Sequence, residues 1–268
     1  MFQFKITNSE FILFREFIYD YAGINLGDEK KMLVTSRLGK RLRHYSLKNF
    51  RAYFELINDT SHAAERQVAI DLLTTNETYF FREPKHFKFL KKEVLSRWSS
   101  GKALRVWSAA SSSGEEAYSI AMLLDDVLEN RPWEVFGSDI SSRVLKRARQ
   151  GHYLQSRIDG IPEEYLRKYC LKGVGEHEGT LLINKALRKR VRFSSVNLKK
   201  SLEEVGFFEV IFLRNVLIYF DFDTKRNIIK QLIEQMQPRG YLFVGHSESL
   251  KGIHEGLEFV APAVYQKI

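Results

Sequence analysis

Acidic side chains in this 268-residue chain stand where short apolar runs end, which is where α/β proteins place ligand-binding groups. Leu104–Trp107 is such a run, and a turn of seven small residues, Ser108–Gly114, separates it from Glu115. Trp133–Asp139 is a second run, and it ends in an acid. In nucleotide-binding α/β folds, an acid at the end of the second strand hydrogen-bonds the hydroxyls of a ribose. The two segments therefore predict a site for a ligand that contains a ribose.

The composition of the small-residue turn narrows the choice of ligand. A dinucleotide-binding turn needs three glycines to seat a pyrophosphate, and this turn has only Gly114. Glu115 and Glu116, at the start of the following helix, would also repel a phosphate. S-adenosylmethionine carries adenine, ribose and a positive charge, and it fits better. The alternative is a plain strand-to-helix connection, with Asp139 as the N-cap of a helix over Ser141–Arg149.

Two further apolar runs also end in polar side chains. Val191–Leu198 is expected to form a strand, with Asn197 near its end. Phe207–Leu213 is continuously apolar, which is typical of a parallel strand buried on both faces. It is followed by three polar residues, Arg214, Asn215 and Tyr219. Because the carboxyl ends of parallel strands share one edge of a sheet, we expect these side chains to lie near Asp139.

Residues 76–268 as a whole alternate strands and helices, which predicts an α/β domain with a Rossmann-like, mostly parallel sheet. The last predicted elements are a helix and two strands, Asp223–Gln237, Tyr241–Gly245 and Glu258–Tyr265. Pro238 and Gly240 are expected to stop the helix before the first of these strands. A glycine-rich stretch with a short β-like run indicates a small β-subdomain inserted at about residues 170–187.

Residues 1–75 are predicted to form a separate, small all-helical domain. Apolar residues recur there at helical spacing in four segments, Ser9–Tyr21, Lys30–Tyr45, Leu47–Ile57 and Ala63–Leu73. Gly23 and Gly27 interrupt the pattern after the first segment. The region contains no predicted strand and no ligand-binding turn.

A mixed polar and aromatic segment, Leu73–Pro84, joins the two predicted domains. It fits neither a regular helix nor a regular strand. Either it is a linker packed by its aromatic residues, or it is a lid that turns polar side chains into the site. The residues in question are Asn76, Thr78 and Arg82.

The second predicted helix is strongly basic. The range Lys30–Arg51 holds eight Lys or Arg residues and no acid, and Arg37 and Arg41 share the face opposite the apolar stripe. Such a face is often only solvated, but solvated helices usually mix charge signs. Together with the net charge of +9, the pattern favours docking on an acidic partner.

Other classes of protein are disfavoured by what the sequence lacks. Cys170 is the single cysteine, so no internal disulfide forms and a reducing compartment is expected. There is no pattern of a secretory leader and no run of ~18 apolar residues. We therefore expect a cytoplasmic protein that does not insert into a membrane. His152, His177 and His254 lack metal-ligand spacing, and no metal site is predicted.

Six segments closely resemble the CheR family of chemotaxis receptor glutamate O-methyltransferases. They are TTNETYFFREPKHF, RVWSAASSSGEEAYSIA, FGSDIS, VRFSSVNL, FEVIFLRNVLIYFD and GYLFVGHSESL. The resemblance runs in order over essentially the whole chain. It implies a class I methyltransferase domain with a small β-subdomain, behind a helical N-terminal domain. It also implies that the protein uses S-adenosylmethionine, releases S-adenosylhomocysteine, and methylates glutamates on the cytoplasmic helices of chemoreceptors.

The resemblance also implies which residues form the site. The cofactor pocket would be lined by Asn76, Thr78, Arg82, Glu115, Asp139, Asn197, Leu198, Arg214 and Asn215, with Glu115 preferred over Glu116. Arg82 and Tyr219 would act in catalysis. The basic residues that would dock on the acidic receptor helices are Arg37, Arg41 and Arg43. In some members of the family the β-subdomain binds a C-terminal receptor peptide, and Lys172–Gly179 resembles its loop.

Two other functions are compatible with parts of the sequence. Basic charge also suits a nucleic-acid methyltransferase, but many enzymes that methylate base amines use an Asn/Asp-Pro-Pro-aromatic loop. The corresponding segment here, RNVLIYF, has no Pro-Pro pair, so no nucleic-acid partner is expected. A non-catalytic cofactor-binding adaptor is the other alternative, and the full set of pocket residues disfavours it.

Overall fold

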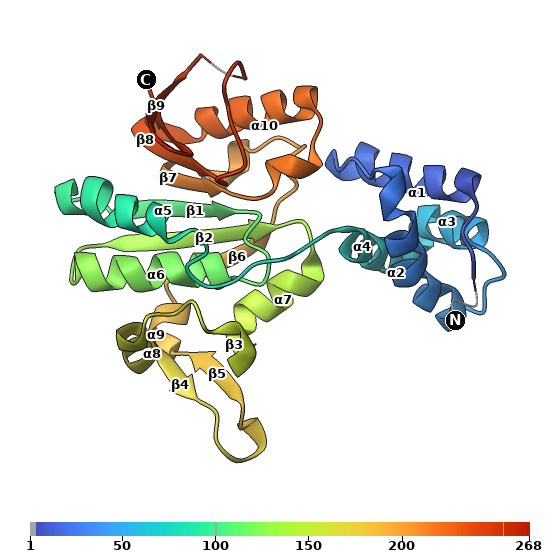
Figure 1. Ribbon diagram of the computed structural model, residues 1–268, viewed down its shortest axis with the longest axis horizontal. Helices are drawn as coiled ribbons and strands as arrows, with labels where there is room; N and C mark the ends of the chain where they lie inside the picture. Colours follow the sequence, from blue (N-terminus) through green and yellow to red (C-terminus); the bar gives the residue numbers. More distant parts are fainter. Residues whose placement is uncertain (1–3, 100, 254) are drawn as a thin grey trace.

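The computed structural model describes residues 4–99, 101–253 and 255–268. His254, one of the histidines considered above for metal-ligand spacing, lies outside these ranges. A small helical domain stands beside a larger α/β domain, and the extended segment after residue 73 connects them (Figure 1). A small β-subdomain projects from the α/β domain at the bottom of the view. The class of fold agrees with the prediction from the sequence.

The helical domain contains the four predicted helices. They are α1 (Asn8–Ala22), α2 (Lys31–His44), α3 (Phe50–Asn58) and α4 (Ala63–Leu73). The helix α1 begins with a capping box, in which Thr7 and Glu10 each accept a hydrogen bond from the other's backbone N–H. The apolar stripes of the helices meet in one core that includes Phe14, Leu38 and Tyr53.

The α/β domain is built on a seven-stranded sheet with the order β6-β2-β1-β7-β8-β10-β9. Its strands are β1 (Leu104–Ala109), β2 (Trp133–Asp139), β6 (Val191–Ser195), β7 (Phe208–Leu213), β8 (Met236–Val244), β9 (Leu257–Ala261) and β10 (Val264–Lys267). The first five strands in this order are parallel, while β10 pairs antiparallel with both β8 and β9. The main helices that cover the sheet are α5 (Pro84–Phe89), α6 (Glu115–Leu128), α7 (Ser142–Gln150) and α10 (Phe222–Glu234).

The end of the chain differs from the prediction in two ways. The strand β8 already begins at Met236, so Pro238 and Gly240 lie inside it rather than before it. The register between β7 and β8 shifts at this point, and Arg239 has a positive φ of 63°, so an irregularity in the ladder accommodates the proline. The predicted last strand is in fact the antiparallel pair β9 and β10.

The β-subdomain is a three-stranded antiparallel sheet inserted between α7 and β6. Its order is β3-β5-β4, with β3 (His152–Leu154), β4 (Cys170–Lys172) and β5 (Thr180–Ile183). Two short helices belong to the same insertion, α8 (Glu163–Tyr169) and α9 (Lys185–Arg188). The sheet therefore starts at His152, earlier in the chain than the predicted range of about 170–187.

The helical domain is held against the α/β domain on two sides. At the end of α1, Lys199 Nζ donates to the carbonyls of Tyr19 and Asp20, and Asn197 Nδ2 donates to the carbonyl of Tyr21 at 2.6 Å. At the end of α4, Asp71 accepts hydrogen bonds from the first residues of α7. Both contacts lie next to a segment that follows a strand of the sheet.

Candidate active site

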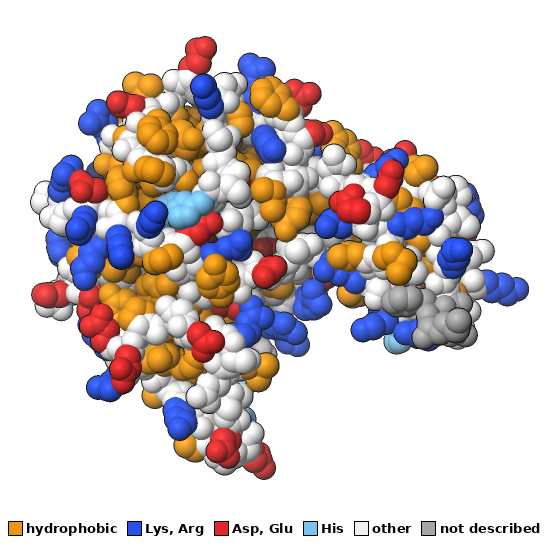
Figure 2. All heavy atoms as spheres, in the orientation of Figure 1, with side chains coloured by type: hydrophobic (Ala, Val, Ile, Leu, Met, Phe, Trp, Pro, Cys, Tyr) orange, Lys and Arg blue, Asp and Glu red, His pale blue; other side chains and the backbone are white. Residues whose placement is uncertain are grey.

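A cavity of about 1180 Å³, its open mouth included, lies between the carboxyl ends of the central strands and the helical domain. Residues that follow β1, β2, β6 and β7 line it on one side, and the segment after α1 lines it on the other. Figure 2 shows the space-filling surface, which is hollowed between the helical domain at the right and the β-subdomain at the bottom. Ligands in open α/β sheets bind at this edge of the sheet.

The turn after β1 is held in place by Asp139. The carboxylate of Asp139 accepts hydrogen bonds from the backbone N–H groups of Ser112 and Ser141, each at 2.9 Å. Asp139 lines the cavity and is only 6% exposed. Burial raises its pKa to about 6, although the backbone hydrogen bonds act in the opposite direction. The carboxylate thus shapes the turn and remains on the cavity wall.

Gly114 closes this turn in a conformation that favours glycine. Its φ is +94°, and a Cβ atom added to it would lie 2.9 Å from the Cβ of Ala148 in α7. The single glycine of the turn therefore allows α6 to begin close to α7. Its role is in packing the turn.

Arg214 is fixed at the end of β7 by two carboxylates. Its guanidinium lies 2.8 Å from Oε2 of Glu116 in the first turn of α6, and 3.0 Å from Oε2 of Glu83. Its side chain is 1% exposed, and its Nε has no hydrogen-bond partner among the described residues. Asn215 also donates to Glu83, at 3.1 Å. Both Arg214 and Asn215 line the cavity.

The preference for Glu115 over Glu116 does not agree with the geometry. Glu116 lines the cavity, whereas Glu115 is absent from its wall and is fully buried. The carboxylate of Glu115 lies 2.9 Å from Arg157 and accepts a hydrogen bond from Ser113. Neighbouring residues of a helix point in different directions, and a sequence that offers Glu-Glu does not show which one faces the ligand.

The segment between the domains forms one wall of the cavity. Asn76, Thr78 and Arg82 all line it, as predicted for a lid that faces the site. The carbonyl of Asn76 accepts a hydrogen bond from Ser112, and the carbonyl of Thr78 accepts one from Arg157. The guanidinium of Arg82 lies over the ring of Tyr79, 5.5 Å from its centroid.

The remaining predicted residues are also on the wall. Tyr219 lies in a short turn after β7, and its backbone carbonyl accepts a hydrogen bond from Asn25. Burial raises the pKa of the Tyr219 hydroxyl, which is half-buried. Asn197 and Leu198 line the cavity where β6 leads toward the helical domain. All predicted pocket residues except Glu115 are thus brought together.

Sequence reasoning missed the contribution of the helical domain to this cavity. The loop and first turn after α1 line it with five residues, Ile24, Asn25, Leu26, Lys30 and Leu33. No ligand-binding motif marks these residues, most of which are apolar. The only signal in the sequence was the interruption of the helical pattern at Gly23 and Gly27, which indicates a loop at this point.

The predicted docking arginines do not form one open basic face. Arg41 makes two hydrogen bonds to Glu65 of α4, at 2.7 and 2.6 Å, and Arg37 donates to the carbonyls of Leu72 and Thr74. Glu65 is 5% exposed, and although burial acts to raise its pKa, the hydrogen bonds from Arg41 and its neighbours lower it overall. Arg43 alone of the three is exposed.

The groups on the cavity wall fit S-adenosylmethionine. Asp139 presents a carboxylate for ribose hydroxyls, and the unpaired Nε of Arg214 remains as a buried donor. Ile24, Leu26 and Leu198 supply apolar surface for a base. The sheet order, the turn after β1 and this cavity define a class I S-adenosylmethionine-dependent methyltransferase.

Comparison with known proteins gives the family. The family model described as "CheR methyltransferase, SAM binding domain" matches residues 76–265, and "CheR methyltransferase, all-alpha domain" matches residues 9–74. The chain belongs to the CheR methyltransferase family. In the part of the chain that the structure describes, no helix is both long and apolar enough to cross a membrane.

Relatives named chemotaxis protein methyltransferase match over nearly the full length. Those of Salmonella typhimurium and Escherichia coli are each 40% identical over 263 residues, which cover 97% of this chain and 90% and 91% of theirs. That of Borreliella burgdorferi is 36% identical over 276 residues, which cover 98% of this chain and 95% of the relative.

Proposed function

We propose that this protein transfers a methyl group from S-adenosylmethionine to glutamate side chains of cytoplasmic chemoreceptor helices, giving glutamyl methyl esters. The observation that carries the proposal is that Asp139, Arg82 and Tyr219 all line the same cavity. A glutamate carboxylate has a pKa of ~4.3 and is ionised at neutral pH, so it needs no base to become a nucleophile. A site that holds a cofactor and presents a cation to the incoming carboxylate is sufficient for this reaction.

When bound, S-adenosylmethionine supplies an electrophilic methyl group. In our proposal Asp139 accepts hydrogen bonds from the ribose hydroxyls, and Arg214 pairs with the carboxylate of the methionine part. Arg82 attracts the substrate carboxylate, and the Tyr219 hydroxyl orients it. Alignment of the two reacting groups can contribute ~7–11 kcal/mol to the lowering of the barrier.

Docking of the receptor would use the exposed basic residues of the helical domain rather than the arginines engaged inside it. Arg43, Lys40 and Lys48 are exposed, whereas Arg37 holds α2 to the end of α4 and Arg41 holds it to the first turn of α4. Of the three arginines predicted to dock on the receptor, we therefore propose this role only for Arg43. A C-terminal receptor peptide would add as a strand to the edge of the β-subdomain.

Methyl transfer with labelled S-adenosylmethionine onto receptor-containing membranes tests the proposal. We expect label that alkali releases as methanol, and no label on RNA. Receptors with Gln at the acceptor positions serve as the matched control. Label that stays on the protein in alkali, or label on RNA, would contradict the ester assignment. Receptors that lack their C-terminal peptide test the role of the β-subdomain separately.

The variant Arg82→Ala tests the role of Arg82. Its side chain is partly exposed, and its one hydrogen bond to the described residues goes to the carbonyl of Glu77 at 3.2 Å. We expect unchanged thermal unfolding and turnover reduced by ~10²-fold or more, since the group that positions the nucleophile is lost. Turnover at the wild-type rate would remove Arg82 from the site.

A further inference from the structure

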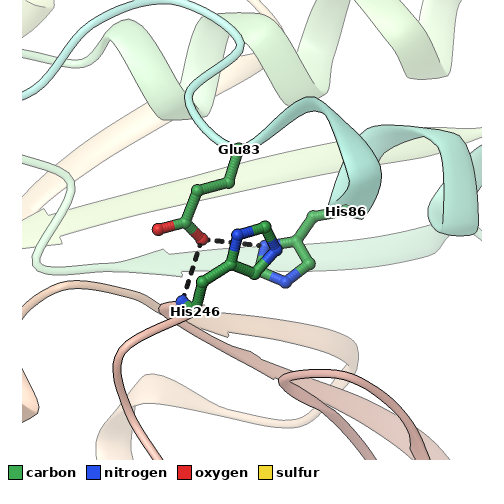
Figure 3. Close-up of side chains that lie close together, drawn as sticks. All are labelled: Glu83, His86 and His246. Atoms are coloured by element: carbon green, nitrogen blue, oxygen red, sulfur yellow. Dashed lines mark hydrogen bonds and ion pairs between the residues drawn. The ribbon is translucent and has the colours of Figure 1, made fainter.

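Three residues from distant parts of the chain meet beside Arg214. Glu83 ends the segment between the domains, His86 lies in α5, and His246 follows β8 (Figure 3). One ligand-type atom from each lies within 4.8 Å of the others. The two imidazole rings have their centroids 4.6 Å apart, and the Glu83 carboxylate points toward them. Spacing along the chain does not indicate this group, because His246 is 163 residues from Glu83.

The ring of the buried member, His86, lies within ion-pair distance of Glu83 but makes no hydrogen bond with the residues that the structure describes (Figure 3). His86 is 1% exposed, and neither of its ring nitrogens makes a hydrogen bond with the described residues. Its Nδ1 faces Oε2 of Glu83 at 3.4 Å, and the backbone carbonyl of Pro262 lies near the ring but outside good hydrogen-bond geometry. Buried polar groups are normally hydrogen-bonded, and a bound cation would satisfy both the His86 imidazole and the Glu83 carboxylate that faces it.

The spacing suits a tetrahedral metal ion. Ligands that bind Zn²⁺ at ~2.0–2.1 Å lie about 3.3–3.4 Å from one another, and the His86 and Glu83 atoms are 3.4 Å apart. His246 is exposed, so its ring can turn to complete the set at little cost.

We propose that Glu83, His86 and His246 form a binding site for a divalent transition-metal ion of the zinc class, with the fourth position open to solvent. Two nitrogens and one oxygen make a ligand set that Zn²⁺ commonly accepts. Arg214 shares the Glu83 carboxylate at 3.0 Å, and its positive charge keeps the affinity below that of a dedicated structural site.

The same contact couples the metal to the cofactor cavity. A metal ion on Oε2 of Glu83 competes with Arg214 for that atom, and it disturbs the carboxylate that also accepts from Asn215. Both of these residues line the cavity. Metal binding therefore weakens cofactor binding, and by linkage the cofactor weakens metal binding by the same factor.

Cobalt titration of the metal-stripped full chain tests the site, because tetrahedral Co²⁺ has an intense visible absorption. We expect a saturable tetrahedral spectrum with one ion per chain, and an affinity roughly tenfold or more lower in His246→Ala. The matched control is His177→Ala, since His152 and His177 form a second pair of neighbouring rings, 5.9 Å apart. No tetrahedral spectrum in the wild type, or an unchanged one in His246→Ala, would overturn the proposal.

Calorimetry with S-adenosylhomocysteine tests the coupling without any measurement of turnover. With Zn²⁺ present, we expect its dissociation constant to rise for the wild type and for His177→Ala, but not for His246→Ala. Equal dissociation constants with and without Zn²⁺ in a protein that binds the metal would refute the coupling.

Discussion

Asp71 of the helical domain should control cofactor affinity although it does not line the cavity. Its carboxylate accepts hydrogen bonds from Ser142 N at 2.9 Å, Ser142 Oγ at 2.8 Å and Arg143 N at 3.1 Å. It thus caps α7 from another domain. Ser142 comes one residue after Ser141, whose N–H donates to Asp139. The loop that aims Asp139 is therefore held at its far end by Asp71.

The size of the effect follows from these contacts. Loss of a helix cap costs ~0.5–2 kcal/mol, and a backbone hydrogen bond to a charged group contributes ~1.5–3 kcal/mol. In Asp71→Ala the first N–H groups of α7 can bind water instead, so we expect a stability loss of about 1 kcal/mol. Partial loss of the Ser141 hydrogen bond to Asp139 would weaken cofactor binding by about tenfold, which is ~1.4 kcal/mol.

Titration calorimetry with S-adenosylhomocysteine measures the affinity, and thermal unfolding measures the stability. The matched control is Asp59→Ala, because Asp59 accepts from Ser61 N at 2.8 Å and caps a turn inside its own domain. We expect that control to lose some stability and keep its affinity for the cofactor. If Asp71→Ala binds S-adenosylhomocysteine as tightly as Asp59→Ala does, the loop keeps its position without the helical domain and the reasoning fails.

Two further predictions concern charged pairs and pH. Arg41→Ala leaves the buried carboxylate of Glu65 without its cationic partner and should destabilise the helical domain by about 3 kcal/mol in urea unfolding. Arg43→Ala should leave stability unchanged and weaken receptor methylation at low salt, and equal stability of the two variants would contradict the assignment. Because burial raises the Asp139 pKa to about 6, the affinity for S-adenosylhomocysteine should fall as pH drops through 6. The stability of the wild-type fold should fall as pH rises from ~4 to 6, since the folded state holds the proton of Asp139 more tightly than the unfolded state does. Asp139→Asn should remove both pH dependences, in calorimetry and in unfolding.

Apolar pattern predicted most of the sheet because its central strands are buried on both faces. Phe208–Leu213 and Trp133–Asp139 differ from their predicted bounds by at most one residue. The failure at Pro238 has a physical cause: a proline is tolerated where the register shifts, and a register shift depends on the partner strand. Local sequence does not contain that information.

Some residues of the candidate site could likewise be predicted from the sequence, and others could not. Residues at strand ends, such as Asp139 and Arg214, were predictable because topology alone brings these ends to one edge. Which of Glu115 and Glu116 faces the cavity was not predictable, because Glu115 pairs with Arg157, a residue of the β-subdomain insertion. The grouping of Glu83 with His246 depends on the packing of α5 against the end of β8 and follows no spacing along the chain.

The basic helix α2 shows that the charge counted along one helix can exceed the charge that this helix exposes to solvent. No acid occurs in Lys30–Arg51, yet Glu65 of a neighbouring helix neutralises Arg41, and Tyr53 also donates to Glu65 at 2.6 Å. That network holds α2, α3 and α4 together, and α4 in turn carries Asp71 to the loop after Asp139. The internal ion pair of the helical domain therefore supports the position of Asp71, which is hydrogen-bonded to the start of α7 beside the cofactor cavity.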